Sequence, residues 1–128
     1  MSFFGWGPNS IESTTKGVQT TLSTLSLLAE VDVNGTNASV PRNGQTWGVT
    51  WIVGSPSTMA VFLLDHALST GTGTTGVINQ TVVSISSGQS GQFYTKHHLD
   101  GSSGNRFRVR VASSIVSAHA KIIAEPLV

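Results

Sequence analysis

A strict two-residue alternation of apolar and polar side chains constrains this chain more than any other feature. It is clearest in residues 106–112, where Phe107, Val109 and Val111 alternate with arginines. Successive side chains on a strand point to opposite faces, so this run predicts a strand with one face on a core. No window shows the apolar spacing of a helix with caps at both ends. The chain therefore predicts an all-β fold.

The same period recurs between short turn segments. Strands are expected at residues 25–33, 47–53, 58–66, 77–86, 92–97, 106–112 and 115–124. Segment 58–66 is apolar on both faces, which predicts a central strand covered twice. After a turn at 87–91, segment 92–97 runs back, and Pro126 is expected to end the last strand. About seven to eight short strands predict an antiparallel β-sandwich or jelly roll.

The first residues differ from the rest of the chain. Phe3, Phe4 and Trp6 stand among glycines and a proline, which oppose helix and strand alike. We expect residues 1–17 to form an extended N-terminal arm and residues 18–128 to form a single β-sandwich domain. The three aromatic side chains need burial. Either the arm folds back over its own domain, or it inserts into a neighbouring subunit.

Charge is scarce and balanced. Lysine and arginine number 7 against 6 acidic residues, and there is no cysteine, while serine and threonine number 18 and 15. A near-neutral chain lacks the basic field that binds nucleic acid or an anionic membrane surface, so neither partner is expected. The longest apolar run, residues 59–64, is far shorter than the ~20 residues of a spanning helix. No basic segment of a signal peptide precedes it, which predicts synthesis in a cytoplasm without export.

One group of residues suggests a metal or an acid–base pair, namely His97 and His98 with Asp100. Adjacent residues on a strand point to opposite faces, so two neighbouring histidines do not easily bind one ion. A zinc site needs three or four converging ligands, and only His66 and His119 remain as distant candidates. We expect no metal and no cofactor.

Other catalytic signatures are weak. Asp65 ends an apolar strand, which favours a strand-terminal hydrogen bond over catalysis. Residues 71–76 match the glycine spacing of a dinucleotide-binding loop, but they precede a strand where that loop requires a helix. No Gly-x-Ser-x-Gly elbow is present. We therefore expect no enzyme and no catalytic residue.

Two other patterns have both a structural and a functional interpretation. Arg106, Arg108 and Arg110 share one strand face at spacings of roughly 6–7 Å. This ladder is either a solvated face that protects the sheet from edge pairing, or an ionic contact for an acidic partner. Trp47 and Trp51 share a face with the valines between and after them. They either fill the core or form a sugar-stacking platform.

An aromatic, glycine-rich arm carrying Phe3, Phe4 and Trp6 leads into a cysteine-free β domain of very few charges. This combination resembles the small structural proteins of tailed-phage virions, especially the decoration or cement proteins of capsid shells. The resemblance implies a β-sandwich or jelly roll, a homo-oligomer around a symmetry axis, and an arm that grips the shell.

Two functions are therefore expected. The first is a non-enzymatic structural subunit located in the virion, made in the host cytoplasm, with capsid or other virion proteins as partners. The alternative is a carbohydrate-binding or host-recognition module. It would use loops 69–76 and 98–105, with Trp47 and Trp51 as glycan contacts.

Overall fold

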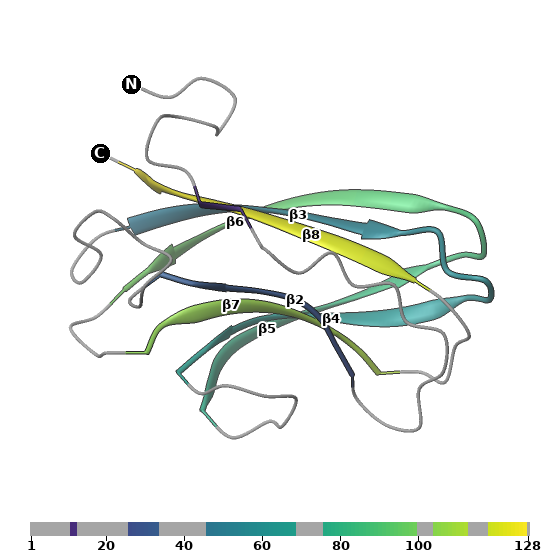
Figure 1. Ribbon diagram of the computed structural model, residues 1–128, viewed down its shortest axis with the longest axis horizontal. Coiled ribbons are helices and arrows are strands. Elements are labelled where there is room, and N and C mark those ends of the chain that lie inside the picture. Colours follow the sequence, from purple (N-terminus) through teal and green to yellow (C-terminus); the bar gives the residue numbers. More distant parts are fainter. Residues whose placement is uncertain are drawn as a thin grey trace.

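The computed structural model describes residues 11–12, 26–33, 46–68, 76–99, 104–112 and 118–127. Within these ranges the strands are β1 (Ile11–Glu12), β2 (Ser26–Asp32), β3 (Thr46–Gly54), β4 (Ala60–Ala67), β5 (Val77–Ile85), β6 (Ser90–His98), β7 (Arg106–Val111) and β8 (His119–Leu127). They form the two stacked layers of Figure 1. The predicted all-β sandwich is confirmed. Nowhere in the described ranges is there a helix with the length and apolarity needed to cross a bilayer.

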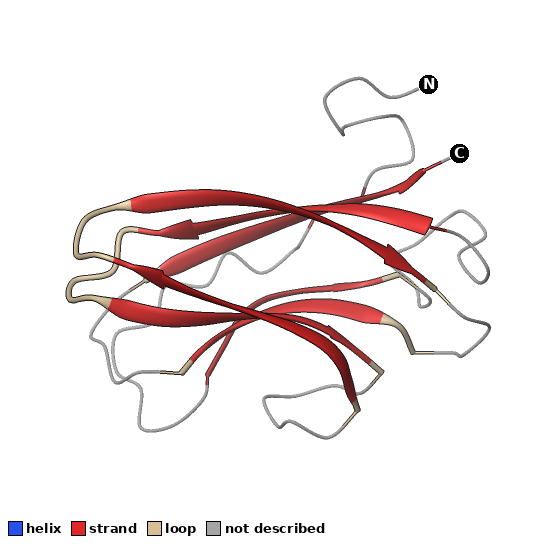
Figure 2. Ribbon diagram, turned by 180° about the vertical axis from the view of Figure 1, so that it is seen from behind, coloured by secondary structure: helices blue, strands red, loops and turns tan. Residues whose placement is uncertain are grey.

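Among the described residues, both sheets are antiparallel and contain four strands each. Sheet A has the order β1-β8-β3-β6, and sheet B has the order β2-β7-β4-β5. Of the described strands, only β4 and β5 both pair with each other and follow each other in the chain. Every other pair of consecutive strands has one member in each sheet, and Figure 2 shows the two layers from behind. This arrangement of eight strands is that of a jelly roll. The turn after β5 therefore leads into the other sheet, not into a hairpin.

The core lies between the two sheets and follows the predicted alternation. Phe107, Val109 and Val111 are fully buried on the inner face of β7, as expected. β4 lies between β5 and β7 and is covered on both faces, which confirms the central strand predicted from its apolar sequence. The largest buried side chains that join these in the core are Trp47, Trp51, Phe62, Leu28, Leu64, Leu99 and Ile122.

Two chain ends differ from expectation. Ile11 and Glu12, inside the predicted arm, form a short strand opposite Ala124 and Ile123 of β8. The last strand does not stop at Pro126 but continues to Leu127. Since β1 pairs with β8 only at residues 123–124, Pro126 has β3 as its one described neighbour, and a missing N–H is tolerated at such a position.

The arm aromatics Phe3, Phe4 and Trp6 lie outside the described residues. Their expected grip on a partner, and the boundary between the arm and the domain at residue 17, therefore stay predictions.

Candidate functional site

The three arginines of β7 share the face of sheet B that points away from the core, but they do not form a solvated ladder. Arg108 and Arg110 are fully buried, so the expectation of an exposed basic face is wrong for both. Arg106 is mostly buried, and its Nη1 lies 3.4 Å from Oε1 of Glu30 while its Nε donates to the carbonyl oxygen of Gly104. The guanidinium groups can lie out of solvent because neighbouring strands place carboxylates on the same face.

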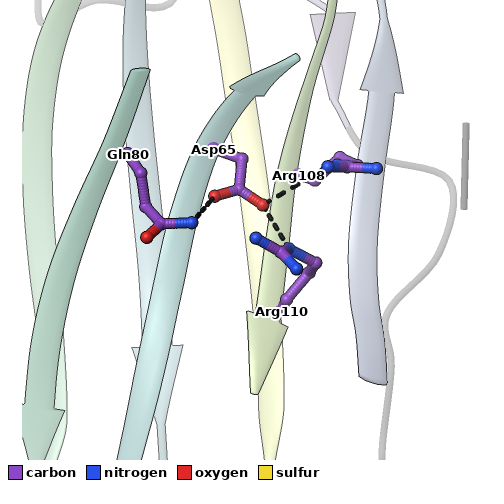
Figure 3. Close-up of polar contacts among 4 residues, drawn as sticks. All are labelled: Asp65, Gln80, Arg108 and Arg110. Carbon is purple, nitrogen blue, oxygen red and sulfur yellow. Dashed lines mark hydrogen bonds and ion pairs between the residues drawn. The ribbon is translucent and has the colours of Figure 1, made fainter. Parts of the chain in front are cut away.

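Asp65 is the centre of this buried cluster. The register of β4 sets it opposite Gln80 of β5 on one side and Arg108 of β7 on the other. Figure 3 shows Arg108 and Arg110 converging on one carboxylate oxygen while Gln80 reaches the other. The Arg108 Nη2 atom lies 3.6 Å from Oδ2, Arg110 Nε donates to the same oxygen, and Gln80 Nε2 donates to Oδ1 at 2.9 Å.

The Asp65 cluster has a structural role, because its charged groups link neighbouring strands. Burial lowers the pKa of the Arg108 guanidinium, and Arg110 and Arg106 act in the same direction, whereas Asp65 and Glu30 raise it. Taking charges out of water costs several kcal/mol per ion, which a well-placed counter-charge offsets. Both Asp65 oxygens are held by N–H donors, so the carboxylate joins three strands. It does more than the strand-terminal hydrogen bond expected from the sequence.

Trp47 and Trp51 are core residues. Their exposed fractions are 0% and 1%, so of the two interpretations the core one is confirmed and the sugar-stacking platform is wrong. Trp51 packs edge-on against Phe107 with ring centroids 6.0 Å apart, and its Nε1 donates to Thr95 Oγ1 at 2.9 Å. The alternation predicted that the two rings share a face, but it did not distinguish a face packed on the opposite sheet from one open to solvent.

The structure brings together two histidines that the sequence kept apart. His66 of β4 and His97 of β6 come from opposite sheets, and their ring centroids are 5.2 Å apart. Both rings also contact Phe107, at centroid distances of 5.1 and 5.2 Å. The His66 Nε2 atom donates to Asn105 Oδ1 at 2.7 Å. Only the stacking of the two sheets creates this contact, so no sequence signal could have located it.

The environment of His97 favours the neutral imidazole. Its Nε2 lies 2.9 Å from Thr95 Oγ1, and this hydroxyl already accepts the Trp51 N–H, so its own proton is available to His97. Burial lowers the pKa of His97 to about 4, and His66 contributes to the shift. Protonation of His97 therefore works against the folded state.

His98 does not share this environment. As predicted for adjacent strand residues, it is exposed on the opposite face from His97, and Asp100 lies outside the described residues. In the described ranges no three His, Cys, Asp or Glu side chains gather as metal ligands would.

A solvent-facing aromatic side chain, missed by the sequence reasoning, lies on the outer face of sheet A. Tyr94 of β6 is 50% exposed. Its ring leans over Gly48 of β3, where an added Cβ would lie 2.3 Å from the phenol oxygen. Burial of the phenol raises the pKa of Tyr94, and the nearby carboxylate of Glu125 raises it further. A glycine at position 48 is therefore required to seat the ring against the sheet.

Polar side chains flank Tyr94 along the same strand. We define the β6 row as the exposed, outward-facing residues Gln92, Tyr94, Lys96 and His98. The inward residues of this strand alternate with them and are only partly exposed. The row thus combines one aromatic ring with amide, ammonium and imidazole groups. The sequence signal for this row is the strand predicted at residues 92–97, but the sequence does not show which side chains of that strand face solvent.

No protein-family model matches the chain, and no curated protein matches it in sequence. Solved structures do match its fold. A CBM4 structure has a TM-score of 0.52 and 8% identity over 77% of this chain. This chain spans 60% of that protein's length, less than two thirds of it.

Two further matches are weaker. A carbohydrate-binding module from Cellvibrio mixtus lichenase 5A, solved with cellotriose, has a TM-score of 0.45 and 12% identity over 93% of this chain and 97% of its own. The PRD1 vertex protein P5 has a TM-score of 0.48 and 8% identity over 93% and 73%. The chain is thus a β-sandwich similar in fold to the CBM4 structure.

Proposed function

We propose that this protein is a non-catalytic carbohydrate-binding module and that the β6 row is its glycan contact. The observation that carries the proposal is the half-exposed Tyr94 ring, held against the sheet over Gly48. A ring seated in this way offers a large contact area at a low cost in conformational entropy. It is the kind of surface on which the apolar face of a sugar ring stacks.

The neighbours of Tyr94 provide the polar half of such a contact. Gln92 and Lys96 follow the same face of β6, each roughly 6–7 Å away at strand spacing. An amide both donates and accepts hydrogen bonds, and an ammonium donates, so the pair suits the hydroxyl groups around a sugar ring. Binding sites with a few polar groups around an apolar surface fix the orientation of a ligand in this way.

The fold similarity is compatible with this proposal at the level of the scaffold. Fold does not imply function, so the proposal is carried by the Tyr94 surface. The structural virion subunit expected from the sequence depends on Phe3, Phe4 and Trp6, which the described residues do not include. That role, with its virion location and capsid partners, stays a prediction. A recognition module can also belong to a virion.

Replacing Tyr94 with alanine should weaken glycan binding at least tenfold, which corresponds to about 1.4 kcal/mol. A glycan array of the wild-type chain identifies the sugar, and isothermal titration calorimetry then measures its affinity. Tyr94→Phe should keep most of the affinity because the ring remains. Since Trp47 and Trp51 are buried, the sugar should leave the fluorescence of these two residues almost unchanged.

The control is Met59→Ala, because Met59 is 62% exposed and lies outside β6. It should bind with wild-type affinity. The proposal is wrong if the wild-type chain binds no glycan, or if Tyr94→Ala binds as tightly as the wild type.

A further inference from the structure

Beyond Tyr94, the β6 row carries two basic side chains. Lys96 and His98 are exposed and lie on the same face of sheet A as Tyr94. The register places Lys96 directly opposite Gly48 of β3, the glycine under the tyrosine ring. The ring therefore leans away from its own cross-strand neighbour, Thr50, and toward the strand position of Lys96. An aromatic ring and a positive charge thus occupy adjacent positions on the open surface.

The next cross-strand pair adds hydrogen-bonding groups. Thr46 of β3 lies opposite His98, and its Oγ1 is 3.4 Å from Nδ1 of the imidazole. In the tautomer in which the hydroxyl donates to Nδ1, the other ring nitrogen carries a hydrogen and can donate to a ligand. A charged imidazole donates from both nitrogens. This end of the row therefore presents N–H donors, which form their strongest hydrogen bonds with a negatively charged oxygen.

The negative charge on this face is held away from the row. Among the described side chains it belongs to Glu125 of β8, which lies across Gly48 from Lys96 and is only 3% exposed. Glu12 also has a register position on this face, but β1 is three strand spacings from β6, roughly 14 Å. Because burial and Glu125 raise the pKa of the Tyr94 phenol, the ring itself stays uncharged at neutral pH. The exposed charge beside the ring is therefore positive.

We infer that the sugar bound at Tyr94 is acidic and that Lys96 and His98 hold its carboxylate or sulfate group. This inference rests on the proposed glycan contact and adds the chemical class of the sugar. Lys96 is the next position of the row, roughly 6–7 Å along the strand, within reach of a substituent at the edge of a stacked sugar ring. Its ammonium binds an anionic oxygen as a point charge. Repulsion by Glu125, on the far side of Gly48, directs the acidic group toward β6.

A glycan array that holds uronic-acid and sulfated oligosaccharides beside their carboxyl-reduced and desulfated forms tests the charge of the sugar. Each pair keeps the same sugar ring and differs in the acidic group. Isothermal titration calorimetry on the best pair should give roughly tenfold tighter binding of the acidic form, as expected for hydrogen bonds to a charged group. The array also shows whether the group is a carboxylate or a sulfate.

Variants of the lysine assign the preference to this site. Lys96→Met removes the charge but keeps an unbranched side chain, so it should remove most of the preference and leave the affinity for the neutral form unchanged. Lys96→Arg should keep the preference. The matched control is Lys121→Met, which makes the same change in net charge on the same face, two strands away and four residues further along, roughly 16 Å from Lys96. It should bind as the wild type does.

Two failures are distinguishable. Equal affinity of the wild type for the acidic and neutral forms overturns this inference and leaves the proposed function intact, whereas a wild type that binds no sugar overturns both. The inference is also wrong if the preference persists in Lys96→Met, or if Lys121→Met loses it to the same extent.

Discussion

Replacing Asp65 with asparagine should lower the free energy of unfolding by about 3–5 kcal/mol. The substitution keeps the volume of the side chain but removes the negative charge between Arg108 and Arg110, whose side chains are fully buried. The free-energy cost of keeping the two guanidinium groups out of water is then no longer offset by the charge of Asp65. Since a domain is typically stable by about 5–15 kcal/mol, this loss is a large part of the total.

Urea denaturation followed by circular dichroism measures the effect. The control is Glu30→Gln, which removes the partner of Arg106 in a pair that keeps partial solvent access and should cost about 1 kcal/mol or less. Replacing Asp65, Arg108 and Arg110 together by apolar residues of similar volume should recover much of the stability. An equal loss in the free energy of unfolding for Asp65→Asn and Glu30→Gln would show that the Asp65 cluster does not act as a buried ion pair.

The protein should lose about 2 kcal/mol of stability as the pH falls from about 6.5 to about 4. The pKa of His97 is lowered from 6.5 in the unfolded chain to about 4 in the folded one, so the unfolded chain binds the proton first. The stabilising contribution is therefore complete above pH 6.5 and is lost toward pH 4. The full shift corresponds to about 3 kcal/mol, which the partial solvent access of His97 reduces.

Denaturation curves at a series of pH values test this dependence. His97→Phe should flatten the slope between pH 4 and 6.5, because the phenyl ring fits the contacts with His66 and Phe107 but takes up no proton. The neighbouring residue provides the control, since His98→Asn changes an exposed imidazole and should leave the slope as in the wild type. Identical slopes in all three proteins would exclude His97 as the titrating group.

The alternation predicted the local structure well. It predicted β7 with Phe107, Val109 and Val111 facing the core, and it predicted that Trp47 and Trp51 share a face. A period of two is a property of each strand by itself, so the sequence contains it directly. The sandwich follows because such strands can bury one face only against another layer.

The charged cluster could not be predicted in the same way. Arg108 and Asp65 are on different strands, and they meet only because β7 and β4 pair in one particular register. The alternation shows that Arg108 points away from the core, and polar residues in that position are usually solvated. Its burial depends on what covers the outer face of sheet B, which is a property of the whole chain.

The sequence by itself determined the strands, their inner faces and the absence of a strong basic field, because these depend on neighbours along the chain. The tertiary structure decided which polar residues are buried and which aromatic residue is open to solvent. His97 meets His66 across two sheets, and Tyr94 lies on Gly48 across two strands. These contacts join residues far apart in the sequence, and strand pairing and sheet stacking, not local periodicity, bring them together.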